Sequence, residues 1–189
     1  MTEQLLELAV MVSAGQTSAS RAHLARLAAR LGYLAIHVPH TLGAAMHADE
    51  RAHLITSAEP TLVVFEDDID PVGVVRVNDP ELVSLARREL YAMGERRPLV
   101  VAVPVSIGRT LSEAAARADL AEDFVGASHP KVSGIFGTFE QAQVQVLALA
   151  HAGAEVLLVS VPDVPDVADL LAQIRALVVG ATPALFRSS

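Results

Sequence analysis

SGIFGTFEQAQVQVLALAHAGAEVLLVSVP, residues 133–162, indicates the fold class of this chain. Thr138 and Gln141 have the spacing of a capping box, the pair of side chains that begins a helix. Apolar residues continue from there to Gly153, and EVLLVSVP then has the composition of a buried strand. A helix between two strands forms a βαβ unit, and such units build a parallel sheet.

The same alternation recurs along the chain. Residues 8–13 (LAVMVS) and 34–39 (LAIHVP) are apolar runs, and the helical pattern between them ends at Gly32. We count five or six strands alternating with helices, which predicts a single α/β domain over residues 1–189. The other expected elements are strands at 61–67 and 99–108 and helices at 49–58, at 80–94, from Thr110 and at 164–179.

Composition excludes several classes of function. The chain has 189 residues, 52% of them hydrophobic, with a net charge of -8. Basic residues are too few to follow a nucleic-acid backbone, and no apolar run is long enough for a membrane span. The chain has no cysteine, which excludes disulfides and thiolate chemistry and suits a reducing compartment. The acidic start, MTEQLLELAV, is unlike a signal peptide, so we expect a cytoplasmic protein.

Three stretches carry a family resemblance: ELAVMV with RAHLARLAARLGYLAIHVP, then RPLVVAVPVSIGRTLSEAAARAD, then the βαβ stretch from Gly134 to Pro162. Together they resemble the bacterial luciferase-like monooxygenases, flavin- or deazaflavin-dependent oxidoreductases with a TIM-barrel fold. A TIM barrel takes about 250 residues. The resemblance therefore implies a truncated member of the family, whose fold is a shortened or incomplete TIM-barrel-like parallel sheet with alternating helices.

The resemblance also implies a cofactor site at the carboxyl ends of the strands, where barrel enzymes hold their ligands. The cofactor would be FMN or a deazaflavin coenzyme, unless the shortened chain binds none. His40 is the candidate catalytic residue, because a neutral histidine there can hydrogen-bond a reduced flavin or a substrate oxygen. The candidate cofactor-binding residues are Ser13, His37, Ser106, Arg109, Gly137 and Thr138.

Structural roles compete with several of these assignments. Capping explains Thr138 and Gln141 without any phosphate, and Thr110 with Glu113 forms a second capping box beside Arg109. The segment HADERAH (residues 47–53) and the acidic run FEDDID (residues 65–70) lack the converging spacing that a metal site needs. The sequence therefore predicts no metal site at either segment.

Three functions stay open. The chain is a luciferase-like oxidoreductase, or a non-catalytic homologue that acts as a binding or partner subunit, or an unrelated α/β enzyme that uses histidines and carboxylates with a metal. An incomplete barrel leaves sheet edges that need covering, so we expect a homodimer or a complex with a related subunit.

Overall fold

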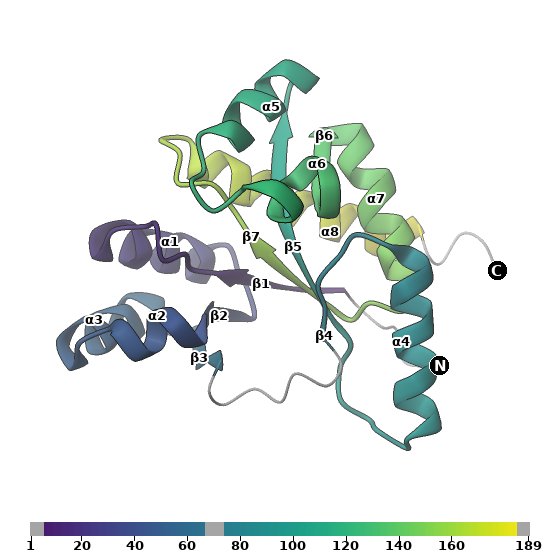
Figure 1. Ribbon diagram of the computed structural model, residues 1–189, viewed down its shortest axis with the longest axis horizontal. Helices are drawn as coiled ribbons and strands as arrows, with labels where there is room; N and C mark the ends of the chain where they lie inside the picture. The colour runs from purple at the N-terminus through teal and green to yellow at the C-terminus, as the bar shows by residue number, and fades with distance from the viewer. Residues whose placement is uncertain (1–5, 67–73, 185–189) are drawn as a thin grey trace.

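The computed structural model describes residues 6–66 and 74–184 of the chain. Seven strands in these ranges form one sheet, and every recorded pair of neighbouring strands is parallel (Figure 1). The order across the sheet is β3-β2-β1-β7-β5-β4, with β6 paired to β5 alone. The strands are β1 (Glu7–Met11), β2 (Ala35–Val38), β3 (Leu62–Phe65), β4 (Val74–Val75), β5 (Val100–Gly108), β6 (Ile135–Thr138) and β7 (Val156–Ser160).

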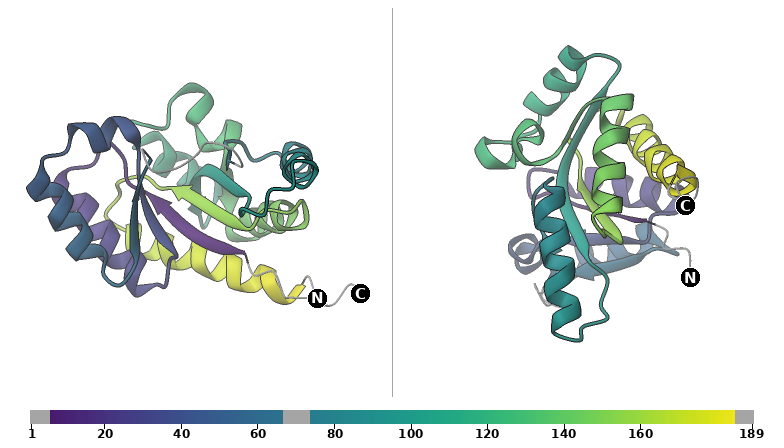
Figure 2. Two further views of the ribbon diagram at one scale, coloured as in Figure 1. Left: turned by 90° about the horizontal axis from the view of Figure 1, so that it is seen from below. Right: turned by 90° about the vertical axis from the view of Figure 1, so that its right-hand side faces the viewer.

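Helices alternate with these strands, and α8 contacts both α1 and α7 (Figure 2). Within the described ranges, no helix combines the length and the apolar composition needed to cross a bilayer. The helices are α1 (Ser18–Arg30), α2 (His40–Ala45), α3 (Ala48–Ala58), α4 (Pro80–Ala92), α5 (Leu111–Asp119), α6 (Pro130–Ser133), α7 (Phe139–His151) and α8 (Val167–Ala184), with a 3₁₀ turn at Gly126–Ser128.

The main hydrophobic core lies between the sheet and its covering helices. Alternate residues along each strand face this core, as the two-residue period of a strand requires. Leu8 and Val10 of β1, for example, are almost completely buried there with Leu170 and Ile174 of α8. Burial of this apolar surface is the dominant favourable contribution to folding.

The opposite face of the sheet carries a second, smaller apolar cluster. Its buried members are Ala9, Ala35, Ala102, Val156 and Leu158, one or two from each of four neighbouring strands. The three alanines leave space on this face, because they project only a methyl group from the sheet. The fold is thus a parallel α/β sheet with helices packed on one face and a shallower apolar lining on the other.

The barrel is not closed. Strands β3 and β4 are the two edges of the sheet and do not pair with each other in the described residues. At their carboxyl ends, the Arg76 guanidinium Nη2 lies 3.2 Å from Glu66 Oε1, so an ion pair spans the gap that backbone pairing leaves. The incomplete TIM-barrel-like sheet expected from the sequence is therefore confirmed.

Strand β5 changes partners at Pro104. Residues up to Pro104 pair with β7, whereas Val105 to Gly108 pair with β6. Gly134 stands just ahead of β6, and a Cβ added to it would lie 2.1 Å from the carbonyl oxygen of Pro104. The absence of a side chain at Gly134 is what lets the start of β6 approach β5 so closely.

The predicted elements are present in the structure, whereas several short ones, α6 among them, were not predicted. The five strands named from apolar runs are all present, and β6 is the strand expected ahead of Thr138. Thr138 and Gln141 form the reciprocal capping box, with Thr138 N–H donating to Gln141 Oε1 at 2.9 Å. Helix α2 and strand β4 were not anticipated, because six and two residues are too short for a periodic signal.

We predict that Gly134→Ala lowers the free energy of unfolding by about 2–3 kcal/mol, because the new methyl group collides with backbone that has no room to move. Urea denaturation followed by circular dichroism measures this loss. The backbone of Gly134 is extended (φ -120°), so the effect is steric and owes nothing to a left-handed conformation.

Gly180→Ala is the matched control. Gly180 lies in α8, where an added Cβ meets only the end of the Gln143 side chain at 3.4 Å. Alanine within a helix is favoured over glycine, so this variant should gain about 0.5–1 kcal/mol. Equal stability of both variants would contradict the packing described for β6.

Candidate functional site

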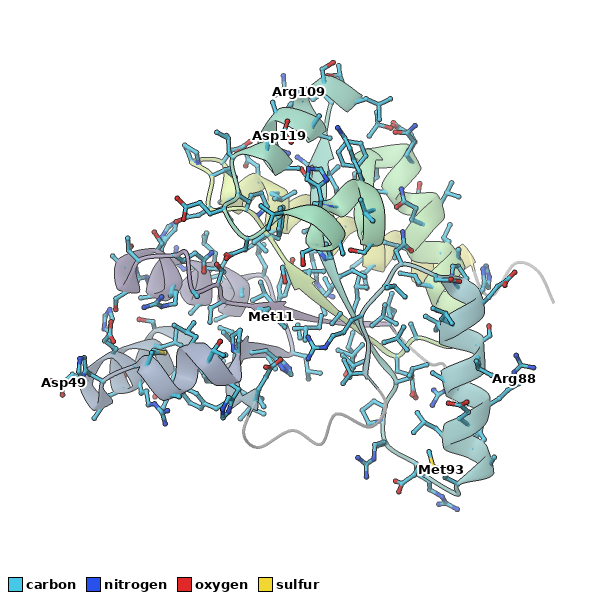
Figure 3. All side chains as sticks on the ribbon, viewed as in Figure 1. Met11, Asp49, Arg88, Met93, Arg109 and Asp119 are labelled. Carbon is cyan, nitrogen blue, oxygen red and sulfur yellow. The ribbon has the colours of Figure 1, made fainter. Side chains whose placement is uncertain are left out.

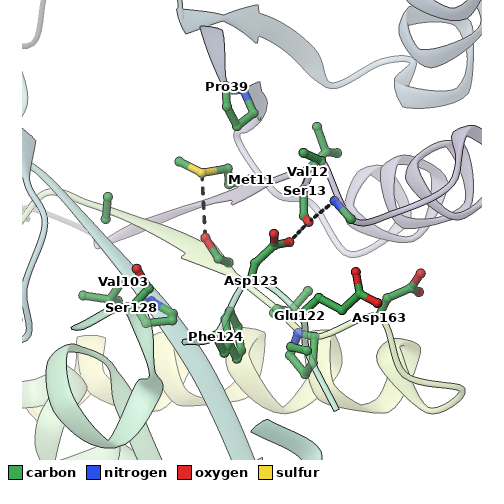
Figure 4. Close-up of a pocket in the computed structure, with 18 of the residues that line it drawn as sticks. Met11, Val12, Ser13, Pro39, Val103, Glu122, Asp123, Phe124, Ser128 and Asp163 are labelled. Carbon is green, nitrogen blue, oxygen red and sulfur yellow. Dashed lines mark hydrogen bonds between the residues drawn. The ribbon is translucent and has the colours of Figure 1, made fainter. Parts of the chain in front are cut away.

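A cavity of about 830 Å³ lies at the carboxyl ends of β1, β2, β4 and β7, beside the middle of β5 (Figure 4). Met11, Ala102, Val103 and Pro104 contribute its apolar part from β1 and β5. The polar side chains come from the connections that follow the strands, namely Ser13, Gln16, Thr41, Arg76, Glu122, Asp123, Ser128, Ser133, Ser160 and Asp163. An apolar cavity with a polar rim is the usual form of a small-molecule site.

The connection from β1 to α1 forms one wall and is held by its own hydrogen bonds. Ser13 N–H donates to Gln16 Oε1 at 3.0 Å, and Gly15 N–H donates to Ser13 Oγ at 3.0 Å. The buried Arg21 guanidinium donates to the carbonyl of Gln16 at 2.6 Å. These three hydrogen bonds hold Ser13 and Gln16 in place at the cavity wall, because they tie the backbone of residues 13–16 to the buried side chains of Gln16 and Arg21.

The connection from α5 to α6 forms the facing wall. Ser13 Oγ donates to the Asp123 carboxylate across the cavity, so the two walls are joined (Figure 4). Phe124, next to Asp123, is almost fully buried and anchors the connection. Helix α6, which follows this connection, ends at Ser133, and the carbonyl of Ser133 accepts a hydrogen bond from Asn78 N–H at 2.8 Å. This bond ties α6 to the segment after β4.

The rim near β2, β3 and β4 is polar. Glu66 accepts hydrogen bonds from the backbone N–H of His40 at 3.1 Å and from Arg76 at 3.2 Å. Arg76 is the one basic residue among the described residues that line the cavity, and its side chain is 63% exposed. The lining carries three carboxylates against this single cation, so its electrostatic character is acidic.

His37 lies on β2 at the inner face, level with Met11 of β1 and Val64 of β3. Its Nδ1 is buried and has no hydrogen-bond partner among the described residues. Burial lowers the pKa of His37 below 6.5, and the nearby Glu66 carboxylate opposes part of this shift. The neutral ring is therefore the favoured form near neutral pH.

The structure does not bring the seven predicted site residues together. Ser13 lines the cavity, and His40 lies between Pro39 and Thr41, which also line it. Ser106 is buried and donates to the carbonyl of Ala114 at 2.7 Å. Arg109 is exposed beyond the end of β5, far from Met11 in Figure 3.

Gly137 and Thr138 also stand outside the cavity lining. Gly137 has a φ of +130°, and a Cβ there would lie 2.4 Å from Gln141 Oε1. The Thr138 hydroxyl accepts the N–H of Gln141, so both residues serve the start of α7. The turn therefore has a structural role as the start of α7.

Sequence reasoning missed the acidic lining. Glu122, Asp123 and Asp163 lie in connections with no recognisable motif, and only the folded chain places them at one cavity. The one sequence feature that could have indicated this wall of the cavity is the connection from α5 to β6, which is longer than is usual in α/β units. In the described ranges no three His, Asp or Glu side chains are arranged to hold a metal ion, and residues 67–70 of the acidic run lie outside those ranges.

Comparison with known proteins yields little. No family model matches the chain, and no curated protein matches it. Among solved structures, it is similar to the crystal structure of the 3-dehydroquinate dehydratase from Aquifex aeolicus VF5, at 7% sequence identity and a TM-score of 0.30. The alignment covers 90% of this chain and 98% of that one. A likeness this distant assigns neither a family nor an activity to the chain.

The pH dependence of stability provides a test of the His37 environment. Because the pKa of His37 is lowered in the folded state, the unfolded chain binds this proton more readily. The contribution of the neutral ring is complete above pH 6.5 and is lost as the pH falls below 6.5 toward the folded-state pKa.

We therefore predict that the native protein loses stability below pH 6.5 more steeply than His37→Gln. Urea denaturation of both proteins from neutral to acidic pH measures the difference, in which the contributions of other titrating groups cancel. An NMR titration of the His37 ring gives the pKa directly. Stability curves that run parallel across this range would contradict the described burial of the ring.

Proposed function

We propose that the chain is a binding protein for a small organic molecule, which it holds in the cavity at the carboxyl ends of the strands. The observation that carries this proposal is the cavity itself, which combines about 830 Å³ with an apolar part on the strands and a polar rim on the connections. Ligands of parallel α/β folds bind at this end of the sheet. Among the three functions considered from the sequence, this proposal corresponds to the non-catalytic homologue that acts as a binding subunit.

The oxidoreductase alternative has less support, because the residues at hand do not fit the phosphate of FMN or of a deazaflavin coenzyme. A phosphate site needs backbone donors or cations free of competing partners. Asp163 and Asp166 stand ahead of α8, at the helix start where a complete barrel binds phosphate. Arg117 nearby is engaged with Asp166 and with the carbonyl of Ile107.

Residues of the cavity make the proposal testable by NMR. We expect neutral aromatic alcohols and amides to perturb backbone amide signals at residues 11–16, 102–103 and 120–128, because these segments line the cavity. Ala102→Leu should weaken such binding about tenfold, since the larger side chain fills the inner face. Ala52→Leu, an exposed change on α3, is the control and should leave binding unaltered.

FMN supplies the contrasting measurement. Under the proposal, protein added to FMN leaves the flavin fluorescence and absorption unchanged. A bound flavin that perturbs the same cavity residues would overturn the binding role in favour of the oxidoreductase. Perturbations spread evenly over the surface with every probe would overturn the cavity as a site.

A homodimer also stays a proposal, and the outer side of α4 supports it. Leu82 and Leu85 are 46% and 45% exposed on this helix, and Met93, which follows it directly, is 61% exposed. Leu82, Leu85 and Glu89 share one side at helical spacing, and Arg88 flanks them. Two copies of α4 packed antiparallel about a two-fold axis would cover the leucines and bring each Glu81, exposed on the same flank as Arg88, toward the partner subunit's Arg88.

Sedimentation of the purified chain tests this dimer. We predict that Leu85→Glu produces a monomer, because it places a charge in the covered face. Val144→Glu is the matched control, since Val144 is 67% exposed on α7, away from α4's outer side, and its replacement should preserve the dimer. A native chain that sediments as a monomer would exclude the proposed interface.

A further inference from the structure

The charges that line the cavity are unevenly distributed. Glu122, Asp123 and Asp163 contribute carboxylates, while the single described cation, Arg76, is paired with Glu66. Figure 4 shows the three acidic side chains gathered around the cavity, with Asp123 directed toward Ser13. A negative potential in a partly enclosed space attracts cations and repels anions, because the surrounding protein screens charge less than water does.

Asp123 is held in place, which distinguishes it from a freely moving surface acid. Its Oδ2 accepts the hydrogen bond from Ser13 Oγ, and Ser13 Oγ in turn accepts from Gly15 N–H. A Cβ on Gly15 would lie only 3.3 Å from Asp123 Oδ2, so the glycine makes room for the carboxylate. Asp123 Oδ1 has no hydrogen-bond partner in the described part of the chain and is available to a ligand donor.

Gln16 supplies a hydrogen-bond donor on the same wall of the cavity as Ser13. It lines the cavity, is only 5% exposed, and uses its Oε1 to accept from Ser13 N–H. Its amide nitrogen Nε2 has no hydrogen-bond partner among the described residues. This nitrogen is not among the buried unpaired atoms, so solvent reaches it at the cavity and it can donate to an oxygen of a ligand there.

The apolar part of the lining indicates which kind of molecular body the ligand has. Met11 of β1 and Ala102 of β5 belong to the apolar face of the sheet that the cavity adjoins, and the buried Phe124 stands beside Asp123. Such side chains favour an apolar body over a highly hydrated one. The cavity thus offers a carboxylate acceptor, an amide donor and an apolar surface at one place.

We propose that the ligand of this cavity is an organic amine with an apolar body and a nearby hydroxyl or carbonyl oxygen. Its ammonium group binds the carboxylate of Asp123, with Glu122 and Asp163 adding to the attraction. Its oxygen accepts the hydrogen bond from Gln16 Nε2, and its apolar body rests on Met11, Ala102 and Phe124. This inference rests on the proposed binding function and specifies the charge of the molecule that is bound.

Three probes that share one phenylpropyl body separate charge from shape. Phenylalaninol carries an ammonium group and a hydroxyl, N-acetylphenylalaninol is neutral, and 3-phenyllactate is an anion. We expect NMR titrations to give the tightest binding for phenylalaninol, by about tenfold over the neutral probe, and the weakest for 3-phenyllactate. The perturbed amides should include those of Gln16 and Asp123.

Asp123→Asn tests the residue itself, because asparagine can still accept the hydrogen bond from Ser13. This variant should bind phenylalaninol about tenfold more weakly while its affinity for N-acetylphenylalaninol is unchanged. Asp49→Asn removes the same charge at an exposed site on α3, remote from the cavity in Figure 3, and should alter neither affinity. Thermal melting of each variant verifies that it is folded.

The outcomes separate the two proposals. Binding of all three probes in the cavity with equal affinity would overturn the amine specificity and leave the binding function intact. Tighter binding of 3-phenyllactate would also overturn it, since the carboxylates would then not govern recognition. Absence of cavity binding by every probe would overturn both the specificity and the binding function.

Discussion

The structure depends on the division of the central strand β5 at Pro104. Proline has no backbone N–H to donate, so a regular ladder on both sides of a strand cannot continue through it. In this chain the pairing with β7 stops at Pro104 and the pairing with β6 starts at the next residue. The two neighbours are therefore displaced along β5, and the connection from α5 to α6 enters beside the strand ends to form a wall of the cavity.

The polar groups at the strand ends differ from those that a phosphate site needs. The groups that would serve a phosphate, namely Thr138, Arg117 and the exposed Arg109, are engaged in capping, committed to other elements, or turned away from the cavity. The cavity instead has carboxylates, hydroxyls and a buried amide, which favour donor-bearing and positively charged ligands. The sheet is barrel-like, but the residues that line the cavity lack the phosphate-binding features expected of a flavin-dependent barrel.

The sequence predicts the fold better than the site for a physical reason. Strands such as residues 99–108 and caps such as Thr138 with Gln141 are local patterns, and each indicates its own structure. The cavity is assembled from Ser13, Asp123 and Asp163, which meet only because three strands end at the same edge. Ser13 is the last residue of the apolar run 8–13, so its place at the end of a strand follows from a local pattern. Asp123 and Gln16 lie in connections, where no periodic pattern indicates which way a side chain points.

The ion pair between Glu66 and Arg76 has a mechanical consequence. Backbone pairing fixes neighbouring strands about 4.8 Å apart, so a closed barrel of a given number of strands has a fixed circumference. Here the interval between β3 and β4 is spanned by two long side chains, one of them largely in solvent. Such a pair is weak and compliant, because exposed ion pairs contribute about 0–1 kcal/mol. In the described residues the spacing of the two sheet edges is therefore set by a side-chain ion pair and by no backbone ladder.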